Sequence, residues 1–168
     1  MKSPKEQFSL VYDQYIDKIY RFVYLKVDSQ ETAEDLTSKV FLKGLEAYQK
    51  DQKINNPGAF LYQIARNTII DHYRENDRTK TMPAEFIGQI ADPKTNLYEK
   101  AVFSESIETT KLAIQNLKKD YQDVIIWHYL EDMPITQIAE ILNKPAGTIR
   151  VMIHRGLKSL KDKLIEQA

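Results

Sequence analysis

The chain has 168 residues, a length that suits one domain or two small ones with a buried core. Its 24 basic and 24 acidic residues give a formal net charge of zero, which excludes a polycation that coats nucleic acid indiscriminately. It contains no cysteine, which excludes disulfide frameworks and thiolate metal sites. Because no apolar run resembles a signal peptide or a membrane span, we expect a soluble protein of the cytoplasm.

Helical periodicity dominates the chain, and no alternating strand pattern competes with it. Apolar side chains at helical spacing from Phe8 to Val23 predict a first helix. Asp28 and Glu31 form a predicted capping pair ahead of a second helix, whose apolar positions run from Ala33 to Leu45.

A third helix is predicted from Pro57 to about Asn76, with Asn56 as its cap and Pro57 at the first helical position. Five of its side chains recur at steps of three or four and therefore share a face. These are Phe60, Gln63, Asn67, Asp71 and Arg74. Aromatic, amide and guanidinium groups together can stack on unpaired bases and hydrogen-bond to them. Taken alone, the same face also fits an ordinary solvated helix.

The helical pattern breaks down over residues 77–96, where prolines and a glycine lie among polar side chains. A second helical block opens near Leu97, and Asp120 is predicted to cap a helix within it. Trp127 is expected in the core of this second block. We therefore predict an all-α fold with two small helical domains, residues 1–78 and 97–168, joined by a flexible linker over residues 79–96.

The segment from Pro134 to Leu160 predicts two short helices joined by a tight turn at residues 143–147. Ala139 would lie at the helix crossing, where a small side chain allows close approach. Asn143 falls where the turn needs a left-handed backbone, which Asn tolerates well. The second helix is basic on one side. This spacing is typical of a helix-turn-helix, whose second helix enters the DNA major groove.

Three segments, taken in order, resemble the bacterial RNA polymerase sigma factors of the extracytoplasmic-function group. They are residues 33–48 (AEDLTSKVFLKGLEAY), 59–74 (AFLYQIARNTIIDHYR) and 134–160. The resemblance implies that residues 1–78 form a region 2-like bundle that binds the β′ clamp helices of core polymerase and opens the −10 element. It implies that residues 97–168 form a region 4-like domain that reads the −35 duplex and touches the β flap. An anti-sigma factor is a further implied partner.

The resemblance also implies a role for individual residues. Core polymerase binding falls on Asp35, Phe41 and Lys43. Recognition of the −10 element falls on Asn55, Asn56, Phe60, Gln63, Asn67, Asp71 and Arg74, with residues 49–56 matching a base-capturing loop. Recognition of the −35 element falls on Thr148, Arg150, Val151, His154, Arg155 and Lys158. Arginine can donate two hydrogen bonds to guanine, lysine near phosphate adds affinity without sequence preference, and Val151 can contact a thymine methyl group.

No catalytic arrangement is found in the sequence, and we expect neither an enzyme nor a cofactor or small-molecule substrate. The three histidines have no partners at metal-ligand spacing, so no metal site is expected. Two other classes fit the second helical block: a regulator that binds palindromic operators without polymerase, and an all-helical adaptor. The match across residues 33–74 favours a sigma factor, because neither alternative needs a helix that reads unpaired bases.

Overall fold

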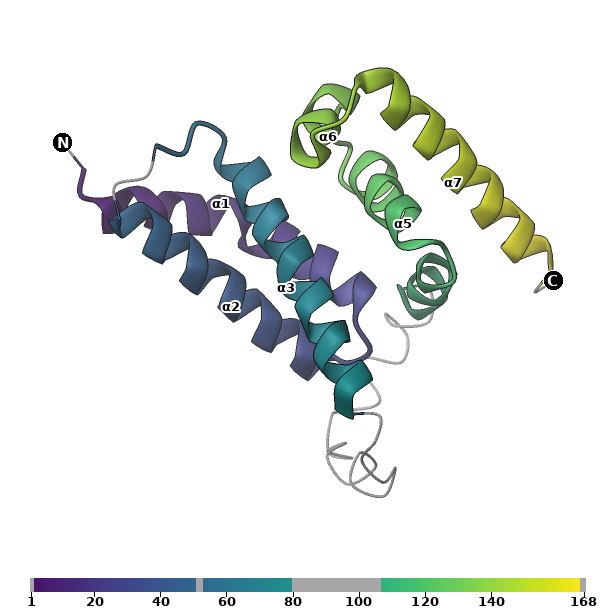
Figure 1. Cartoon of the computed structure of the whole chain (residues 1–168), viewed down its shortest axis with the longest axis horizontal. Coiled ribbons are helices and arrows are strands. Elements are labelled where there is room, and N and C mark those ends of the chain that lie inside the picture. Colours follow the sequence, from purple (N-terminus) through teal and green to yellow (C-terminus); the bar gives the residue numbers. More distant parts are fainter. Residues whose placement is uncertain (1, 51–52, 80–106, 167–168) are drawn as a thin grey trace.

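A computed structural model of the protein describes residues 2–50, 53–79 and 107–166, and every regular element in these ranges is a helix (Figure 1). The all-α prediction is therefore confirmed. The elements are α1 (Pro4–Lys26), α2 (Gln30–Gln49), α3 (Pro57–Thr79), a helix over residues 107–115, α5 (Lys119–Ile125), the π-helix η1 (Ile126–Leu130), α6 (Ile135–Leu142) and α7 (Ala146–Glu166). The predicted linker lies outside the described residues from residue 80 onward. None of the helices in the described ranges is long and apolar enough to span a membrane.

Helices α1, α2 and α3 form the amino-terminal bundle around an apolar core. Among its fully buried side chains are Ile19, Phe22, Val40 and Leu61. Burial of such side chains contributes about 1.5–3 kcal/mol each relative to exposure, which holds the three helices together. The apolar stripes predicted from the sequence therefore mark the core of this bundle.

Hydrogen bonds from side chains to the backbone fix where these helices begin. Asn56 caps α3 as predicted, because its Oδ1 accepts from the Ala59 N–H at 3.1 Å. The predicted cap of α2 is wrong by one residue. Ser29, not Asp28, caps that helix, because the Ser29 Oγ accepts from the Thr32 N–H at 3.1 Å.

The carboxy-terminal bundle comprises residues 107–115, α5, η1, α6 and α7. Gly156 allows α7 to lie against α5, because a Cβ at this position would sit 3.2 Å from atoms of both Ile125 and Tyr121. Asp120 is the second residue of α5 and not its cap; the helix begins after Lys118 without a side-chain cap. The predicted helix is therefore present, but it begins at Lys119, before the predicted cap.

Helices α6 and α7 confirm the helix-turn-helix. Asn143 ends α6 with a left-handed backbone, φ 53° and ψ 49°, as its position predicts. The Lys144 N–H then donates to the Ala139 carbonyl at 3.1 Å and closes the turn. Ile149 and Ile153 of α7 are buried, so one side of the second helix packs inward and leaves the other in solvent.

The π-helical turn η1 has no counterpart in the predicted elements. The Glu131 N–H donates to the Ile126 carbonyl at 3.1 Å, a wider spacing than that of an α-helix. Asp132 follows with a left-handed φ of 50°. This segment carries Trp127 and leads into Glu131, and both residues contact the amino-terminal bundle.

The two bundles lie against each other across a mixed apolar and polar interface (Figure 1). Trp127 stacks on Phe22 of α1, with ring centroids 5.3 Å apart, and meets Tyr62 of α3 edge-on at 5.4 Å. Trp127 is fully buried, as predicted, but part of its burial comes from the other bundle. The sequence analysis placed it only in the core of its own domain.

Candidate nucleic-acid interface

The outward face of α3 carries the polar side chains that the sequence analysis selected. Gln63, Asn67, Asp71 and Arg74 are exposed, and Phe60 is half-buried. The opposite side of the helix supplies Ala59, Thr68 and Ile69 to the core. The helix therefore presents amide, carboxylate and guanidinium groups along one exposed line, with the half-buried Phe60 at its start.

The start of this face opens into a hollow of about 230 Å³. It is lined by Lys53, Ile54, Asn55, Asn56, Ala59, Phe60, Gln63 and Glu140. The loop before α3 and the first turns of the helix thus share one concave site. Lys53 was not among the predicted residues, although its place in the same polar loop was a usable signal. Its ammonium group adds a positive charge to a site that also contains amides, an aromatic ring and the Glu140 carboxylate.

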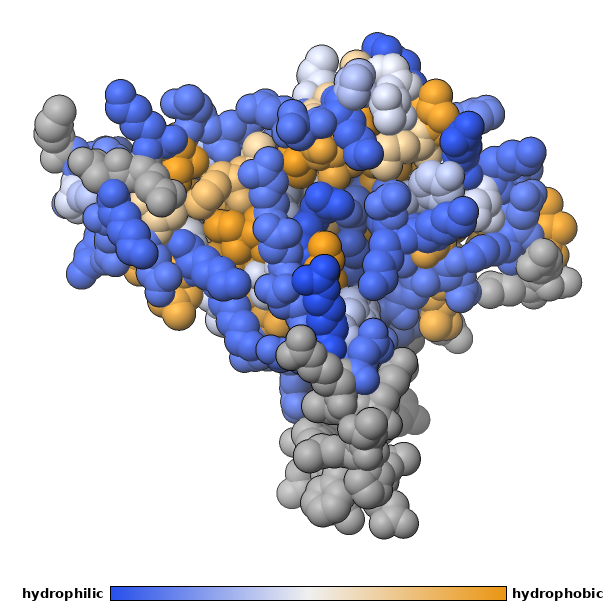
Figure 2. All heavy atoms as spheres, in the orientation of Figure 1, coloured by the Kyte–Doolittle hydropathy of each residue, from blue (hydrophilic) through white to orange (hydrophobic). Residues whose placement is uncertain are grey.

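A second polar face lies on α7. Its six predicted −35 contacts are all exposed: Thr148, Arg150, Val151, His154, Arg155 and Lys158. They alternate with the buried Ile149 and Ile153, so the basic side of the helix faces solvent while the apolar side packs. Figure 2 shows that hydrophilic side chains cover most of the viewed face of the molecule. The two predicted reading faces belong to different bundles.

The three residues predicted to bind polymerase have different environments on α2. Asp35 is exposed and pairs with Lys39 at 3.4 Å, one helical turn away. Lys43 is exposed and lines a shallow hollow between α2 and α3 together with Asp71. Phe41 is only 5 % exposed and packs edge-on against Tyr12, with ring centroids 4.9 Å apart. Replacing Phe41 would therefore disturb the bundle before it tested a surface contact.

Two of the predicted −10 residues are engaged by the carboxy-terminal bundle. Gln63 donates through Nε2 to the Ile141 carbonyl at 3.1 Å. Asn56 donates through Nδ2 to the Glu140 carboxylate at 2.9 Å. Both acceptors belong to α6, the first helix of the helix-turn-helix. The predicted −10 site is thus in direct contact with the domain predicted to read the −35 element.

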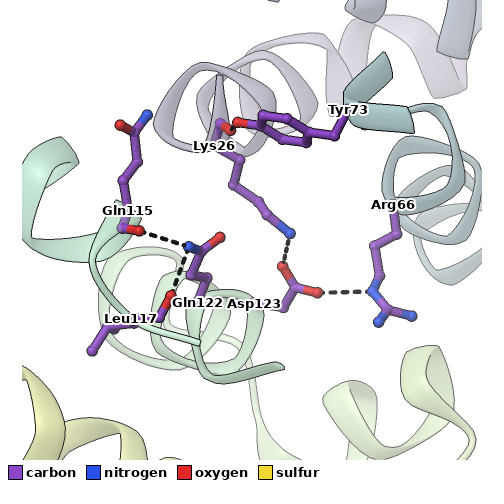
Figure 3. Close-up of polar contacts among 7 residues, drawn as sticks. All are labelled: Lys26, Arg66, Tyr73, Gln115, Leu117, Gln122 and Asp123. Atoms are coloured by element: carbon purple, nitrogen blue, oxygen red, sulfur yellow. Dashed lines mark hydrogen bonds and ion pairs between the residues drawn. The ribbon is translucent and has the colours of Figure 1, made fainter. Parts of the chain in front are cut away.

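A buried ion cluster joins the bundles behind this contact (Figure 3). The Asp123 carboxylate of α5 pairs with Lys26 of α1 and, through its other oxygen, with the Arg66 Nε of α3 at 2.8 Å. The side chains of Lys26 and Asp123 are only 7 % and 3 % exposed. Removing one partner of a buried pair costs about 3–5 kcal/mol when the other charge stays buried. Sequence reasoning missed this cluster because its members lie 57 and 97 residues apart.

Further hydrogen bonds surround the cluster and extend the interface. Gln115 donates to the Val27 carbonyl at 3.0 Å, so the helix over residues 107–115 is tied to the end of α1. Arg21 meets Glu131 with two parallel hydrogen bonds of 2.8 and 3.0 Å. That carboxylate raises the pKa of Arg21, chiefly through the hydrogen bond. The interface is therefore held by four acids of one bundle, Glu108, Asp123, Glu131 and Glu140, facing donors of the other.

The aromatic part of the interface contains two buried polar atoms. Among the described residues, neither the Tyr62 hydroxyl nor the Trp127 Nε1 has a hydrogen-bond partner. Burial also raises the pKa of Tyr62, with the nearby Glu131 charge adding to it. An unsatisfied buried donor costs about 1–3 kcal/mol, so the packed interface carries a free-energy penalty at its centre.

Two family models match the chain, and together they cover both bundles. Sigma-70 region 2 matches residues 11–79, and Sigma-70 region 4 matches residues 108–160. The chain is 31% identical to the ECF RNA polymerase sigma factor SigW of Bacillus subtilis, over 97% of this chain and 91% of that protein. It is 30% identical to the ECF RNA polymerase sigma factor BldN of Streptomyces coelicolor, over 97% of this chain and 62% of that protein.

Two solved structures share the fold. The first is CnrH in complex with the cytosolic domain of CnrY, with a TM-score of 0.68 and 14% identity over 96% of this chain and 89% of that one. The second is the sigma factor RpoE in complex with the anti-sigma factor NepR from Bartonella quintana, with a TM-score of 0.67 and 18% identity over 94% of this chain and 96% of that one.

Proposed function

The chain belongs to the extracytoplasmic-function group of RNA polymerase sigma factors, and we propose that it directs core polymerase to promoters through two separate DNA contacts. Helix α7 reads the −35 element as duplex. The face of α3 and the loop before it read the −10 element after melting. The chain acts in the cytoplasm, and the chemistry of RNA synthesis belongs to the polymerase.

The −10 assignment rests on one observation, the hollow shared by the loop before α3 and the exposed face of that helix. A base leaves the stack at a cost of a few kcal/mol, so a site that captures it must offer compensating contacts. Asn55 and Asn56 supply amide groups at the rim, Phe60 supplies an aromatic surface, and Lys53 supplies a charge for phosphate. Asn67 continues the polar line along the helix toward the next nucleotides.

The −35 assignment is supported by the alternation of exposed and buried residues on α7. Arg150 and Arg155 can each donate two parallel hydrogen bonds to guanine, and Val151, 46% exposed, can contact a thymine methyl group. Lys158 and Thr148 suit the phosphates on either side. In this assignment the arginines provide sequence preference, while Lys158 adds affinity that depends on salt.

Polymerase contacts complete the proposal. The exposed face of α2, with Asp35 and Lys43, binds the β′ clamp helices. On the other bundle, an apolar groove of about 180 Å³ runs between η1 and α7 and includes Leu130, Leu157 and Leu164. We place the β flap in this groove, because exposed leucines gathered in one groove suit an apolar protein segment. An anti-sigma factor, such as the one bound to RpoE in the solved complex, would act by covering these surfaces.

Strand opening tests the −10 assignment. Asn67→Ala should lower the permanganate reactivity of unpaired thymines in complexes of core polymerase, this chain and promoter DNA. The −35 footprint should remain, because α7 is untouched. Gln14→Ala, an exposed substitution on α1, serves as the matched control. Equal thymine reactivity for the Asn67→Ala variant and the parent chain would overturn the role of Asn67.

A further inference from the structure

We propose that Tyr15 of α1 is a positioning residue for the −10 site, because its ring sets the position of Gly58 and of the residues just before α3. The inference rests on the proposed function and adds a residue of another helix to that site. Tyr15 lies near the middle of α1, and Figure 1 shows α3 beginning beside that helix. It is not among the residues predicted to read DNA.

The phenol ring of Tyr15 packs directly against the backbone of Gly58. A Cβ built at Gly58 would lie 2.6 Å from the Tyr15 hydroxyl oxygen, 2.9 Å from its Cζ and 3.0 Å from its Cε1. Ordinary contacts between such atoms are about 3.5 Å or longer, so only glycine fits here without a shift. Because no glycine among the described residues has a positive φ, Gly58 provides space for the tyrosine and not an unusual backbone.

The residues around Gly58 transmit its position to the hollow before α3. The Asn56 Oδ1 accepts from the Ala59 N–H at 3.1 Å, and the Asn56 carbonyl accepts from the Phe60 N–H at 3.0 Å. Pro57, between Asn56 and Gly58, has a φ that its own ring fixes. Asn56 and Phe60 both line the hollow. A shift of Gly58 therefore moves an amide and an aromatic ring of the −10 site together.

Tyr15 also lies near the last turn of α2. Burial raises the pKa of Tyr48, and the neighbouring Tyr15 adds to this effect. Tyr48 packs in turn against Phe8 of α1, with ring centroids 5.4 Å apart. Tyr15 and Tyr48 are both half-buried against the core of the bundle. Tyr15 is therefore close to both helix ends that the predicted base-capturing loop connects, at Tyr48 in α2 and at Gly58 in α3.

The close contact leaves little tolerance for a larger residue at position 58. To restore an ordinary distance from an added methyl group, the ring or the helix would have to move by about 1 Å. A binding site keeps its geometry only when its groups are held within about 0.5 Å. The Lys18 ammonium lies over the Tyr15 ring, 5.6 Å from its centroid, and holds the ring on that side. If the ring instead swings away, Gly58 loses its support, so either response misplaces the reading groups.

Compensating substitutions test the proposal in complexes of the full chain, core polymerase and a promoter that the parent chain selects from a random DNA library. Gly58→Ala should lower the permanganate reactivity of unpaired thymines about tenfold, because a displacement of about 1 Å can cost up to about a hundredfold at a binding site. Tyr15→Leu removes the support and should lower the reactivity about threefold. The double variant should recover most of the parent's reactivity, because the shorter leucine makes room for the alanine methyl group. Gln14→Ala, the exposed neighbour on α1, is the control.

Affinity for core polymerase and the −35 footprint distinguish positioning from loss of the fold. Both should stay like those of the parent in Gly58→Ala and Tyr15→Leu, because the exposed face of α2 and all of α7 are untouched. Parallel loss of polymerase affinity and thymine reactivity would overturn the proposal in favour of a structural role.

Three further outcomes are decisive. Equal reactivity for Gly58→Ala and the parent would overturn the proposal, and so would a double variant no more reactive than Gly58→Ala. Both results leave the sigma function standing, because the parent still opens the promoter. No thymine reactivity with the parent chain would overturn the proposed −10 function, and this inference with it.

Discussion

The Asp123 carboxylate receives Lys26 and Arg66 from two different helices of the amino-terminal bundle. No local sequence pattern predicts this buried ion cluster, because an acid in the middle of α5 has many possible partners in the chain. The same holds for the pair between Arg21 and Glu131, which are 110 residues apart. The sequence predicts side chains that the structure leaves exposed on α3 and α7, but it does not predict which charges the fold buries together.

Asp123→Asn should loosen the docked state. The variant keeps the shape of the side chain but leaves Lys26 without a buried counter-charge, and opening is the least costly way to hydrate that cation. Trp127 is the only tryptophan and stacks on Phe22 across the interface, so its emission should shift to longer wavelength and quench more readily with acrylamide. Far-ultraviolet circular dichroism should stay unchanged, as should the emission of an Asp162→Asn control. A parent-like emission spectrum for Asp123→Asn would contradict the role of Asp123 in holding the two bundles together.

Tyr24 should make stability depend on alkaline pH. Burial, together with its hydrogen bond to Glu108 at 2.8 Å, raises the pKa of Tyr24 to about 12. Because the folded chain holds this proton more tightly than the unfolded chain, the stabilisation is complete below pH 10 and is lost as the pH rises through about 12. Urea unfolding of the parent and of Tyr24→Phe should therefore show a smaller alkaline loss for the variant. Identical losses would remove Tyr24 as the cause.

The two arginines of α7 should carry −35 specificity. Replacing Arg150 or Arg155 with alanine should cost about 1–3 kcal/mol of binding and relax the preference at one base pair. Lys158→Ala should weaken binding to all sequences alike and reduce its salt dependence. Selection from a promoter library with a randomised −35 element measures both effects. The same preferred sequence after removal of both arginines would place specificity in other contacts or in DNA shape.

Among the helices and turns, the boundaries predicted correctly are those that depend on neighbouring residues in the sequence. Asn56 and Pro57 start α3 as expected, and Asn143 ends α6 in the predicted left-handed conformation. The start of α2 was misplaced because Asp28 and Ser29 are both good caps, and only the fold selects Ser29. The π-helical turn η1 could not be predicted, since its residues are equally compatible with an α-helix.

The exposed face of α2 should contribute affinity for polymerase. Asp35→Ala and Lys43→Ala each remove an exposed charge without touching the core, so the bundle should remain folded. We expect core polymerase to bind each variant about three- to tenfold more weakly, as is common for single interface side chains. Glu31→Ala, exposed at the start of the same helix, is the control. Parent-like affinity for both variants would move the clamp contact to another surface.

For the molecule as a whole, the sequence predicted two helical units but not their arrangement. A chain with two domains and a linker is compatible with many relative placements, and the choice depends on contacts such as Phe22 with Trp127. In this arrangement two of the predicted −10 residues, Asn56 and Gln63, donate hydrogen bonds to α6.

Transcription by purified core polymerase on a DNA library with a randomised upstream region tests the central claim most directly. The account predicts specific initiation only when this chain is added, from templates that share two elements at a fixed spacing. Asn67→Ala should reduce initiation from those templates without changing the preferred −35 sequence. Transcription that is unchanged by the chain, together with selection of palindromic duplex sites by the chain alone, would contradict a sigma factor and indicate an operator-binding regulator.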